Sequence, residues 1–458
     1  MQLDRPQLPP ARRVVPVRPR PRLVVRPVER LLRQEVGGAP LLIAAAVAAL
    51  LWANLAGGSY ERMWTSPVRL ELGGFALEED VRHVVNELLM AVFFYVIALE
   101  VKRELRHGAL RDLRTAAVPA AAALGTMVGA AATYVALNVG GDLRGWAIPI
   151  ATDIAFALGV LALAGRRVPR ELRAFMLTLA VVDDLATIAV IAIVFTDDLS
   201  LVWLATAAAL ALVVVAAARA GVRTLAVYVL LGGGIWLAVF ESGVHATLAG
   251  VVLGFLTPIA AVRSPVAVGR AIRARLALVP AAGEAAAGAL LESSRLAASA
   301  VPPLRRMESA LGPWSAYAIL PLFALANAGV PLSPGGIADA LSTRVGIGIA
   351  LGLVVGAPLG GILFSWLVVR FGPGRMPRGL DWPAIAGVAP LKGIGFTIAI
   401  FIAGLTFEER RVQEQVTLAV LVASVAAALL GLAVLRLRYV LVTRRARPAA
   451  GAVRAPRA

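Results

Sequence analysis

The stretch Ala389-Pro-Leu-Lys-Gly-Ile-Gly-Phe396 interrupts an otherwise apolar run over residues 383–405. Pro390 lacks a backbone N–H donor, and the two glycines beside it are poor helix formers, so an unbroken helix is disfavoured here. The run is long enough to cross a bilayer, yet it carries the charged Lys392. Irregular backbone at membrane depth is tolerated only where protein buries it or where it lines a cavity. The stretch therefore predicts a broken membrane helix with a functional centre at the break.

A second apolar run, residues 144–164, is interrupted in the same way, because Pro149 is followed by the polar pair Thr152-Asp153. Either interruption alone is equally compatible with a simple kink. Together they occupy matching places, in the middle of the third to fifth and of the tenth to twelfth expected spans. These two triplets would run in opposite directions through the membrane. Corresponding interrupted helices in inverted repeats are the best sequence indication of a transporter's binding site.

The composition indicates a membrane protein rather than a soluble enzyme or a disordered chain. Of the 458 residues, 59% are hydrophobic and 16% charged, against about 25% charged in soluble domains. We predict an all-α membrane protein with twelve spans of about 20 apolar residues each. The expected spans are 39–57, 82–101, 116–138, 144–164, 172–196, 200–219, 223–240, 244–260, 313–331, 344–370, 383–405 and 412–437. Residues 59–80 alternate with period two around Pro67–Leu72, which predicts a small external β-hairpin whose edge could pair with a second copy.

The formal charge of +17 lies in three segments, residues 1–37, 260–312 and 436–458, and the rest of the chain is neutral. This distribution is typical of the positive-inside rule and predicts both termini in the cytoplasm. We therefore expect a disordered basic tail at 1–37, a twelve-helix domain at 38–437 and a second basic tail at 438–458. A nucleic-acid partner is disfavoured because the arginines are not interleaved with aromatic residues. A signal peptide is not expected.

The absence of cysteine excludes disulfides and thiolate metal sites, and three histidines argue against a histidine-rich metal site. No cofactor is expected. The partners that the composition implies are the lipid bilayer and small ions.

Two adjacent carboxylates, Asp183 and Asp184, lie near the centre of the fifth expected span, in Leu179-Ala-Val-Val-Asp-Asp-Leu-Ala186. An ionisable group at this depth costs about 2.5–3.5 kcal/mol on insertion scales, so it is a functional candidate by default. Neighbouring helix residues point about 100° apart, so the two side chains need different partners. A carboxylate pair in low dielectric favours uptake of a proton or of a hard cation such as Na⁺ or Li⁺. The alternative is a pair of structural acids bonded to neighbouring helices.

Asp153 and Thr152 follow the interruption of the fourth span. We expect Asp153 at the N-terminus of the second half-helix, where the helix dipole favours a negative charge. It could neutralise that helix end or contact the ion directly, and the sequence leaves both roles open. Thr152 could supply a hydroxyl ligand or cap the half-helix.

Lys392 is expected at the C-terminus of the first half-helix of the eleventh span, where the dipole favours a cation. Charge compensation alone would explain it. Residue usage favours a further role, because Lys102 and Lys392 are the only lysines among 45 basic residues. A buried lysine can lose its proton, whereas an arginine effectively cannot. We therefore expect Lys392 to titrate or to pair reversibly with Asp183.

A charged cluster, Glu100-Val-Lys-Arg-Glu104, lies at the cytoplasmic end of the second expected span. Such a cluster is usually a solvated helix end, and the alternative is a pH-sensing mouth. The candidate pH-sensing residues from the residue pattern are Glu100, Lys102, Arg103 and Glu104, together with His245.

Other polar residues fall within or beside the expected spans. His245 enters the eighth span, where a lone histidine is more often a packing residue than a pH switch. Glu87 and Asn327 are expected to form interhelical hydrogen bonds.

Several stretches, found in order over residues 38–437, resemble the NhaA family of sodium/proton antiporters. They are Leu88–Phe94 with Leu99-Glu-Val-Lys-Arg-Glu-Leu105, Ala151-Thr-Asp-Ile-Ala-Phe-Ala-Leu-Gly159, Val182-Asp-Asp-Leu185, Ser242–Gly250, Leu320–Ala324 with Ala326–Gly329, and Gly393-Ile-Gly-Phe396.

The resemblance implies a twelve-helix inner-membrane antiporter that uses the proton gradient to expel Na⁺ or Li⁺. It implies that Asp184 carries the exchanged cation or protons, with Asp183 beside it and with Asp153 and Thr152 at the crossing of the broken helices. By the same resemblance the cluster at 100–104 would contribute to the pH response. The resemblance also implies that Glu308 would face the same funnel, which makes it a further candidate for pH sensing. It implies that an outer hairpin near 59–74 would join two copies in a homodimer.

The sequence departs from the resemblance at one important position. The family usually has a lysine in the tenth span, in the context Gly-Lys-Pro-Leu-Gly, whereas this chain has Gly356-Ala-Pro-Leu-Gly360. The position before Gly-Ile-Gly-Phe, usually uncharged, is Lys392 here. Our hypothesis is that the positive charge has moved from position 357 to the eleventh span and still serves the aspartate pair.

Three other functions remain open from the sequence. Sodium-coupled uptake of an organic anion on the same fold is disfavoured, because Asp153 would block a half-helix N-terminus that an anion prefers. An intramembrane aspartyl protease needs two aspartates on different helices, and here the strongest pair is on one. A channel is less consistent with broken inverted repeats.

Overall fold

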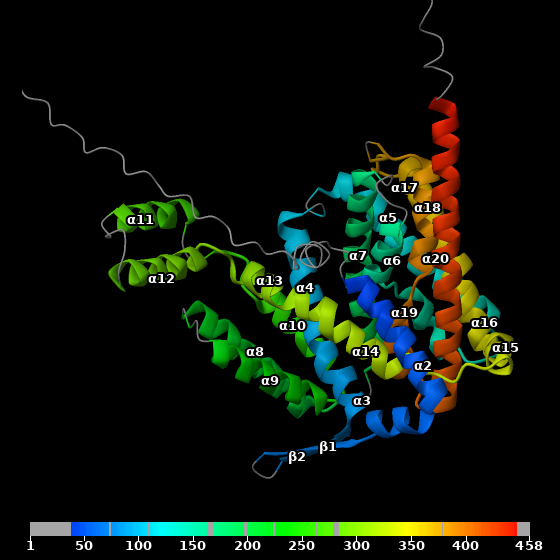
Figure 1. Ribbon diagram of the computed structural model, residues 1–458, viewed down its shortest axis with the longest axis horizontal. Coiled ribbons are helices and arrows are strands. Elements are labelled where there is room, and N and C mark those ends of the chain that lie inside the picture. Colours follow the sequence, from blue (N-terminus) through cyan, green and yellow to red (C-terminus); the bar gives the residue numbers. More distant parts are fainter. Residues whose placement is uncertain are drawn as a thin grey trace, which may run out of the picture.

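The computed structural model describes residues 38–446 except for short gaps at 73–74, 109, 111, 164–168, 197–198, 221, 223–224, 262–263, 278–283 and 378. The tail expected at 1–37 and the end of the tail expected at 438–458 lie outside these residues. The described chain is helical almost throughout (Figure 1). Its first half contains α2 (Gly38–Trp64), β1 (Pro67–Leu72), β2 (Phe75–Asp80), α3 (Val81–Val84), η1 (Val85–Leu89), α4 (Met90–His107), α5 (Leu113–Leu137), η3 (Arg144–Ile150), α6 (Ile154–Leu163), α7 (Arg170–Val194) and α8 (Leu201–Arg219).

The second half begins with two short apolar helices and ends with the longest helix of the described chain. Its elements are α9 (Leu225–Phe240), α10 (Thr247–Leu256), α11 (Pro265–Ala277), α12 (Glu284–Ser299), α13 (Pro303–Trp314), η5 (Ser315–Ile319), α14 (Leu320–Asn327), α15 (Pro334–Ser342), α16 (Arg344–Leu351), η6 (Gly352–Gly356), α17 (Ala357–Phe371), α18 (Trp382–Val388), η7 (Ala389–Gly393), α19 (Phe396–Thr406) and α20 (Arg410–Ala446).

Within the described residues, nine helices are long and apolar enough to cross a membrane, and a bent pair makes ten. This supports a multi-pass membrane protein, but length and composition do not confirm the expected number of twelve. The two remaining expected spans, 223–240 and 244–260, correspond to α9 and α10, which are shorter apolar helices. The apolar surface of α8 agrees with a lipid-facing helix, since Leu201, Val202 and Leu212 are each at least 70% exposed.

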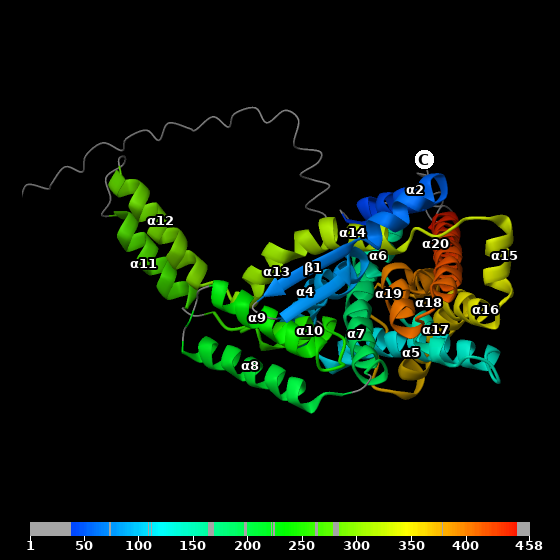
Figure 2. The same ribbon diagram turned by 90° about the horizontal axis from the view of Figure 1, so that it is seen from below.

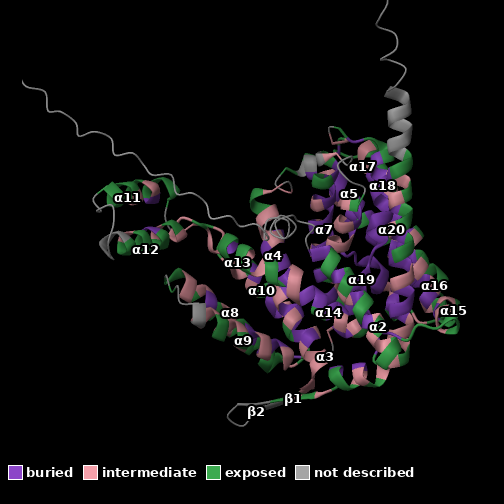
Figure 3. Ribbon diagram, viewed as in Figure 1, coloured by how far each residue is buried: buried purple, intermediate pink, exposed green. Residues whose placement is uncertain are grey.

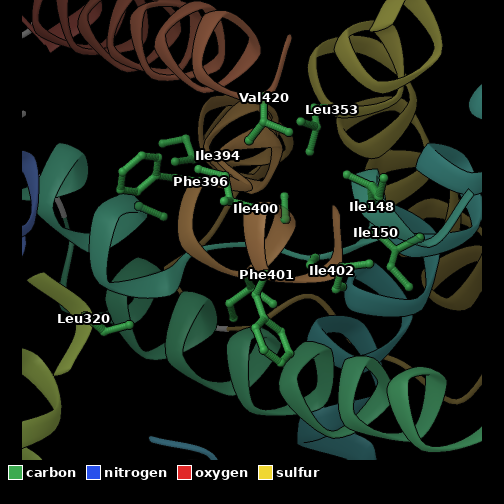
Figure 4. Close-up of a cluster of buried hydrophobic side chains, with 14 of the residues drawn as sticks. Ile148, Ile150, Leu320, Leu353, Ile394, Phe396, Ile400, Phe401, Ile402 and Val420 are labelled. Carbon is green, nitrogen blue, oxygen red and sulfur yellow. The ribbon is translucent and has the colours of Figure 1, made fainter. Parts of the chain in front are cut away.

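Both predicted interruptions are present. In the first, the 3₁₀-helix η3 ends at Ile150, and the chain is extended over 151–153 before α6 begins. In the second, α18 and η7 are separated from α19 by residues 394–395, and the two halves are bent by 42°. The segments cross, because η3 packs against α19 while α6 packs against η7. Apolar side chains fill the space around this crossing (Figure 4), including Ile148 of η3 and Ile400 of α19.

The small β-hairpin is confirmed. β1 and β2 pair antiparallel, with Pro67 opposite Asp80 and Leu72 opposite Phe75. Arg69 and Glu78 face each other across the strands in an exposed ion pair of 2.6 Å. Asp80 then caps α3, since its carboxylate accepts from the His83 N–H at 2.6 Å. The hairpin lies at the opposite end of the helical bundle from the last turns of α20 (Figure 1).

Close helix packing holds the centre of the bundle together. α5 and α17 meet through two small-residue repeats, Gly125-x₃-Gly129 and Gly356-x₃-Gly360. A Cβ atom built on any of these glycines would overlap the backbone of the other helix. Glycine at these positions therefore permits a backbone approach that no other residue would allow.

Much of the burial lies around this centre (Figure 3), where α5, α7 and α17–α20 carry many of the buried residues. Figures 1 and 2 both show α8, α11 and α12 to one side of it. The broken helices thus lie in the best-packed part of the molecule, where irregular backbone is protected.

Candidate ion-binding site

Two hydrogen bonds fix the extended segments where they cross. The Asp153 N–H donates to the Ile394 carbonyl at 2.7 Å, and the Thr152 hydroxyl donates to the Lys392 carbonyl at 2.9 Å. Each bond satisfies a buried polar group that a helix break leaves without an intrahelical partner. The crossing therefore positions the Asp153 carboxylate and the Lys392 side chain against the same group of helices.

Asp153, which is 2% exposed, caps two half-helices at once. Its Oδ1 accepts from the Phe156 N–H at 2.9 Å, in the first turn of α6. Its Oδ2 accepts from the Thr397 hydroxyl at 2.6 Å and from the Thr397 N–H at 3.3 Å, in the first turn of α19. The dipoles of both half-helices favour a negative charge at this point. Of the two roles considered for Asp153, the geometry matches neutralisation of helix ends, and at two ends rather than one.

Lys392 lies in the last turn of η7, and its Nζ donates to Asp183 Oδ2 at 2.7 Å. The side chains are 2% and 1% exposed, so the ion pair is fully shielded from solvent. The partner expected for Lys392 from residue usage is the partner found in the structure. The pair links α7 to the broken helix directly.

The other oxygen of Asp183 has no hydrogen-bond donor among the described residues. Oδ1 is buried and has no hydrogen-bond partner in the part of the chain described. Thr152 lies close enough to interact with this carboxylate, but its single hydroxyl proton goes to the Lys392 carbonyl. A buried acceptor without a donor requires an explanation, and a bound proton or cation supplies one.

Asp184 is the next residue of α7 and is 8% exposed. Its carboxylate makes no hydrogen bond or ion pair with any other described residue. The charges that act on it most strongly are Asp183, Glu100, Lys392 and Asp153, of which three are negative. Asp184 therefore has an excess of negative charge around it, and uptake of a proton or cation would relieve that excess.

The remaining candidates do not form one group. Arg103 gathers three carboxylates, with Glu104 at 3.1 Å, Glu100 at 3.6 Å and Glu308 of α13 in a shorter contact. Lys102 points elsewhere and donates to the carbonyls of Phe255 and Thr257, both at 2.6 Å. Lys102 thereby supplies hydrogen bonds to backbone carbonyls at the C-terminal end of α10, where a positively charged side chain is favourable.

His245 lies beyond the other end of α10, with its ring 6.4 Å from that of Phe195. The ten residues of α10 separate it from Lys102 by about 15 Å of helix. A joint role for His245 with the cluster at 100–104 would therefore have to act over that distance.

The sequence reasoning missed two residues at the crossing. Thr397 supplies two hydrogen-bond donors to Asp153, and the Ser424 hydroxyl of α20 accepts from the Phe396 N–H at 3.3 Å. Thr397 could have been found, because it follows Gly393-Ile-Gly-Phe396 as a hydroxyl residue in the first turn of a half-helix. Ser424 lies in an apolar helix, and nothing in its sequence context indicates a partner.

Position 357, where the resemblance leads one to expect a lysine, holds a buried alanine, 1% exposed, at the first residue of α17. Both α17 and the preceding π-helix η6 pack against η7, which carries Lys392. The two positions therefore belong to neighbouring segments.

The family model for Na⁺/H⁺ antiporter 1 matches residues 29–435. The chain belongs to this family. It is 42% identical to "Na(+)/H(+) antiporter NhaA" of Rhodopirellula baltica, over 92% of this chain and 96% of that protein. It is 43% identical to "Na(+)/H(+) antiporter NhaA 2" of Sorangium cellulosum, over 92% of each chain. Identity to the antiporter of Salmonella paratyphi B is 42%, over 90% of this chain and 98% of that protein.

Proposed function

We propose that this protein is a secondary antiporter that exchanges Na⁺ or Li⁺ for protons across the inner membrane. The observation that carries the proposal is the buried Asp183–Lys392 pair beside the uncompensated Asp184, where two broken helices cross. Family membership and the printed names of the relatives agree with it.

The chemistry follows from competition for carboxylate oxygens. A carboxyl that holds a proton cannot at the same time bind Na⁺ through that oxygen, so cation uptake at Asp184 expels a proton. Asp183 takes part because its free Oδ1 can join the coordination of the cation, while Lys392 competes with the cation for Oδ2. If a cation displaced Lys392 from Asp183, the ammonium group would lose the attraction of the carboxylate and could release a proton, which an arginine could not do.

The half-helices provide the setting for this exchange. Asp153, bonded to both half-helix N-termini, compensates the dipoles of the two half-helices beside the carboxylates of α7. In the alternating-access scheme of such folds, one repeat rocks against the other around the fixed site. We infer inverted repeats built from the third to fifth and tenth to twelfth of twelve spans, with α9 and α10 as the two short ones.

The orientation that we propose places both termini in the cytoplasm and the β-hairpin outside. The hairpin, near residues 59–74, would join two copies in a homodimer through its exposed edge. The group around Arg103 would then lie at the cytoplasmic mouth, where Glu100, Glu104 and Glu308 would adjust the response to pH.

Everted membrane vesicles from cells without other sodium/proton antiporters test the proposal. Addition of Na⁺ or Li⁺ should restore the fluorescence of a pH-sensitive dye with the wild-type chain. Asp184→Asn should abolish the response, because the amide neither binds a proton nor carries a charge. The matched control is Asp339→Asn, the same chemical change on the exposed face of α15.

Wild-type vesicles that respond to neither ion at any pH would overturn the antiporter function. Full activity of Asp184→Asn would overturn the site, and equal loss in Asp339→Asn would show that the assay reports folding rather than ion binding.

A further inference from the structure

A fourth buried carboxyl, in addition to Asp153, Asp183 and Asp184, lies outside the crossing, in the π-helix that precedes α4. Glu87 of η1 is 7% exposed, and its Oε2 has no hydrogen-bond partner among the described residues. Trp236 donates to the backbone carbonyl of Glu87 at 3.3 Å and so does not satisfy the side chain. An ionised carboxylate left in this state is costly, whereas a protonated one is not.

The local backbone holds this side chain in place. Val85–Leu89 form a π-helix, an insertion that is frequent at functional sites. The neighbouring Asn86 exchanges two amide hydrogen bonds with Asn327 of α14, at 2.8 and 3.2 Å. The π-helix that carries Glu87 is therefore joined to a second helix, α14.

Glu87 lines a cavity of about 540 Å³ at the hairpin end of the bundle. Asp80, the last residue of β2, also lines it, and the innermost lining residues of α19 are Ile400 and Phe401. Phe401 packs against the rings of Phe94 and Phe323, at 5.6 and 6.2 Å between centroids. The cavity thus stops one helical turn before Thr397, the partner of Asp153.

His83 lines the same cavity one helical turn before Glu87. Its Nε2 makes no hydrogen bond in the described chain, but it lies 3.8 Å from Oε2 of Glu79, and 42% of the side chain is exposed. One imidazole nitrogen and one carboxyl oxygen without a hydrogen bond among the described residues therefore line the same cavity, and Glu87 is the more buried of the two.

We propose that His83 and Glu87 form an outer proton-loading site. His83 takes a proton from the outside solution on Nε2 and passes it to Oε2 of Glu87, and no other bond forms or breaks. The role of the site in transport rests on the proposed antiport, since it would supply the protons exchanged at Asp184.

The geometry favours a proton over Na⁺ at this site. A proton needs one oxygen, whereas a metal ion needs several ligands, and no group of three His, Cys, Asp or Glu that could hold a metal occurs in the described chain. Other charged groups face the cavity and share in its pH response. They are Asp80, Arg82, His245, Glu408, Arg410 and Glu414, with Glu79 also acting on Glu87 through its charge.

Infrared difference spectra of the purified full chain, recorded between two pH values, test the site directly. The wild-type chain should show the C=O band of a protonated carboxyl, and Glu87→Gln should lose that component. Glu414→Gln is the matched control, because Glu414 lines the same cavity but is paired with Arg410 at 3.1 Å. It should leave the component unchanged. His83→Ala should slow the appearance of the band after a pH jump several-fold.

The same spectra in an Asp184→Asn background separate this proposal from the antiport. Retention of the Glu87 component in that background would uphold the proton site independently of exchange at Asp184. If wild-type vesicles also failed the antiport assay, the transport function would be rejected while the proton site stood. In an active antiporter, Glu87→Gln should also shift the dependence of exchange on outside pH. A carboxyl band that is the same in Glu87→Gln and wild type would overturn the proposal, as would an unchanged outside-pH dependence.

Discussion

Two groups of charged side chains, one at the crossing and one at the end of α4, differ in the identity and burial of their cation. At the crossing, Lys392 pairs with Asp183, with side chains 2% and 1% exposed. At the end of α4, Arg103 serves three carboxylates, and the side chains of this group are 19–42% exposed. The chain therefore has lysine at the solvent-shielded pair and arginine at the partly solvated one.

The difference in burial sets the energy of each group. Removing one partner of a buried pair leaves an uncompensated charge, which costs about 3–5 kcal/mol. An exposed pair contributes about 0–1 kcal/mol and is weakened further by salt. The choice of cation sets the chemistry, because a lysine shielded from water can give up its proton and an arginine keeps its own. The comparison predicts that the crossing combines structural importance with proton chemistry, whereas the Arg103 group adjusts charge at little structural cost.

The largest effect is expected from breaking the buried pair. Lys392→Ala leaves Asp183 charged and without a partner, so the free energy of unfolding should fall by about 3–5 kcal/mol. Thermal unfolding in detergent measures this loss. The double variant Asp183→Ala/Lys392→Ala removes both charges and should recover most of it. Equal destabilisation of the single and double variants would show that the pair contributes through packing rather than charge.

The next prediction exchanges one cation for the other. Lys392→Arg keeps a positive charge beside Asp183, and the larger side chain should cost about 1–3 kcal/mol through overpacking. Its effect on transport should be distinct, because arginine cannot release the proton. We expect Na⁺-driven proton release to fall at least about tenfold. Wild-type exchange and an unchanged pH profile in Lys392→Arg would mean that Lys392 holds the site together without exchanging a proton.

Much of the crossing could be predicted because its residues break a simple pattern. Proline, glycine and charge in an apolar run are rare enough to locate both interruptions and the partners Lys392 and Asp183. The second helix end held by Asp153 could not be predicted, because the contact to Thr397 joins residues 244 positions apart in the chain. Only the relative placement of two half-helices brings those residues together.

Neither the number of spans nor the partner of Lys102 could be predicted from the sequence, and the reasons are related. Hydropathy over 244–260 does not show that α10 ends at Leu256, or that Lys102 satisfies the carbonyls that follow. The π-helix at Val85–Leu89 was also missed, because its sequence fits an ordinary helix. In each case the deciding interaction is tertiary, and local propensity is overridden by it.

The smallest effect on stability is expected at the Arg103 group. Its dependence on salt concentration distinguishes this group from the buried Lys392–Asp183 pair. Arg103→Gln should lower the free energy of unfolding by about 1 kcal/mol or less. We expect a loss towards the upper end of this range, because Glu308 Oε2 is already buried without a hydrogen bond to any described residue. At about 1 M salt the Debye length is only about 3 Å, so most of this loss should disappear. Arg69→Gln is the matched control, since Arg69 and Glu78 form a pair that is 69% and 57% exposed.

The loss of stability in Lys392→Ala should not change with salt, because solvent ions do not reach the buried Lys392–Asp183 pair. A salt-independent loss of several kcal/mol in Arg103→Gln would instead place this group energetically with the buried pair, and burial would no longer explain why the chain has lysine at one site and arginine at the other.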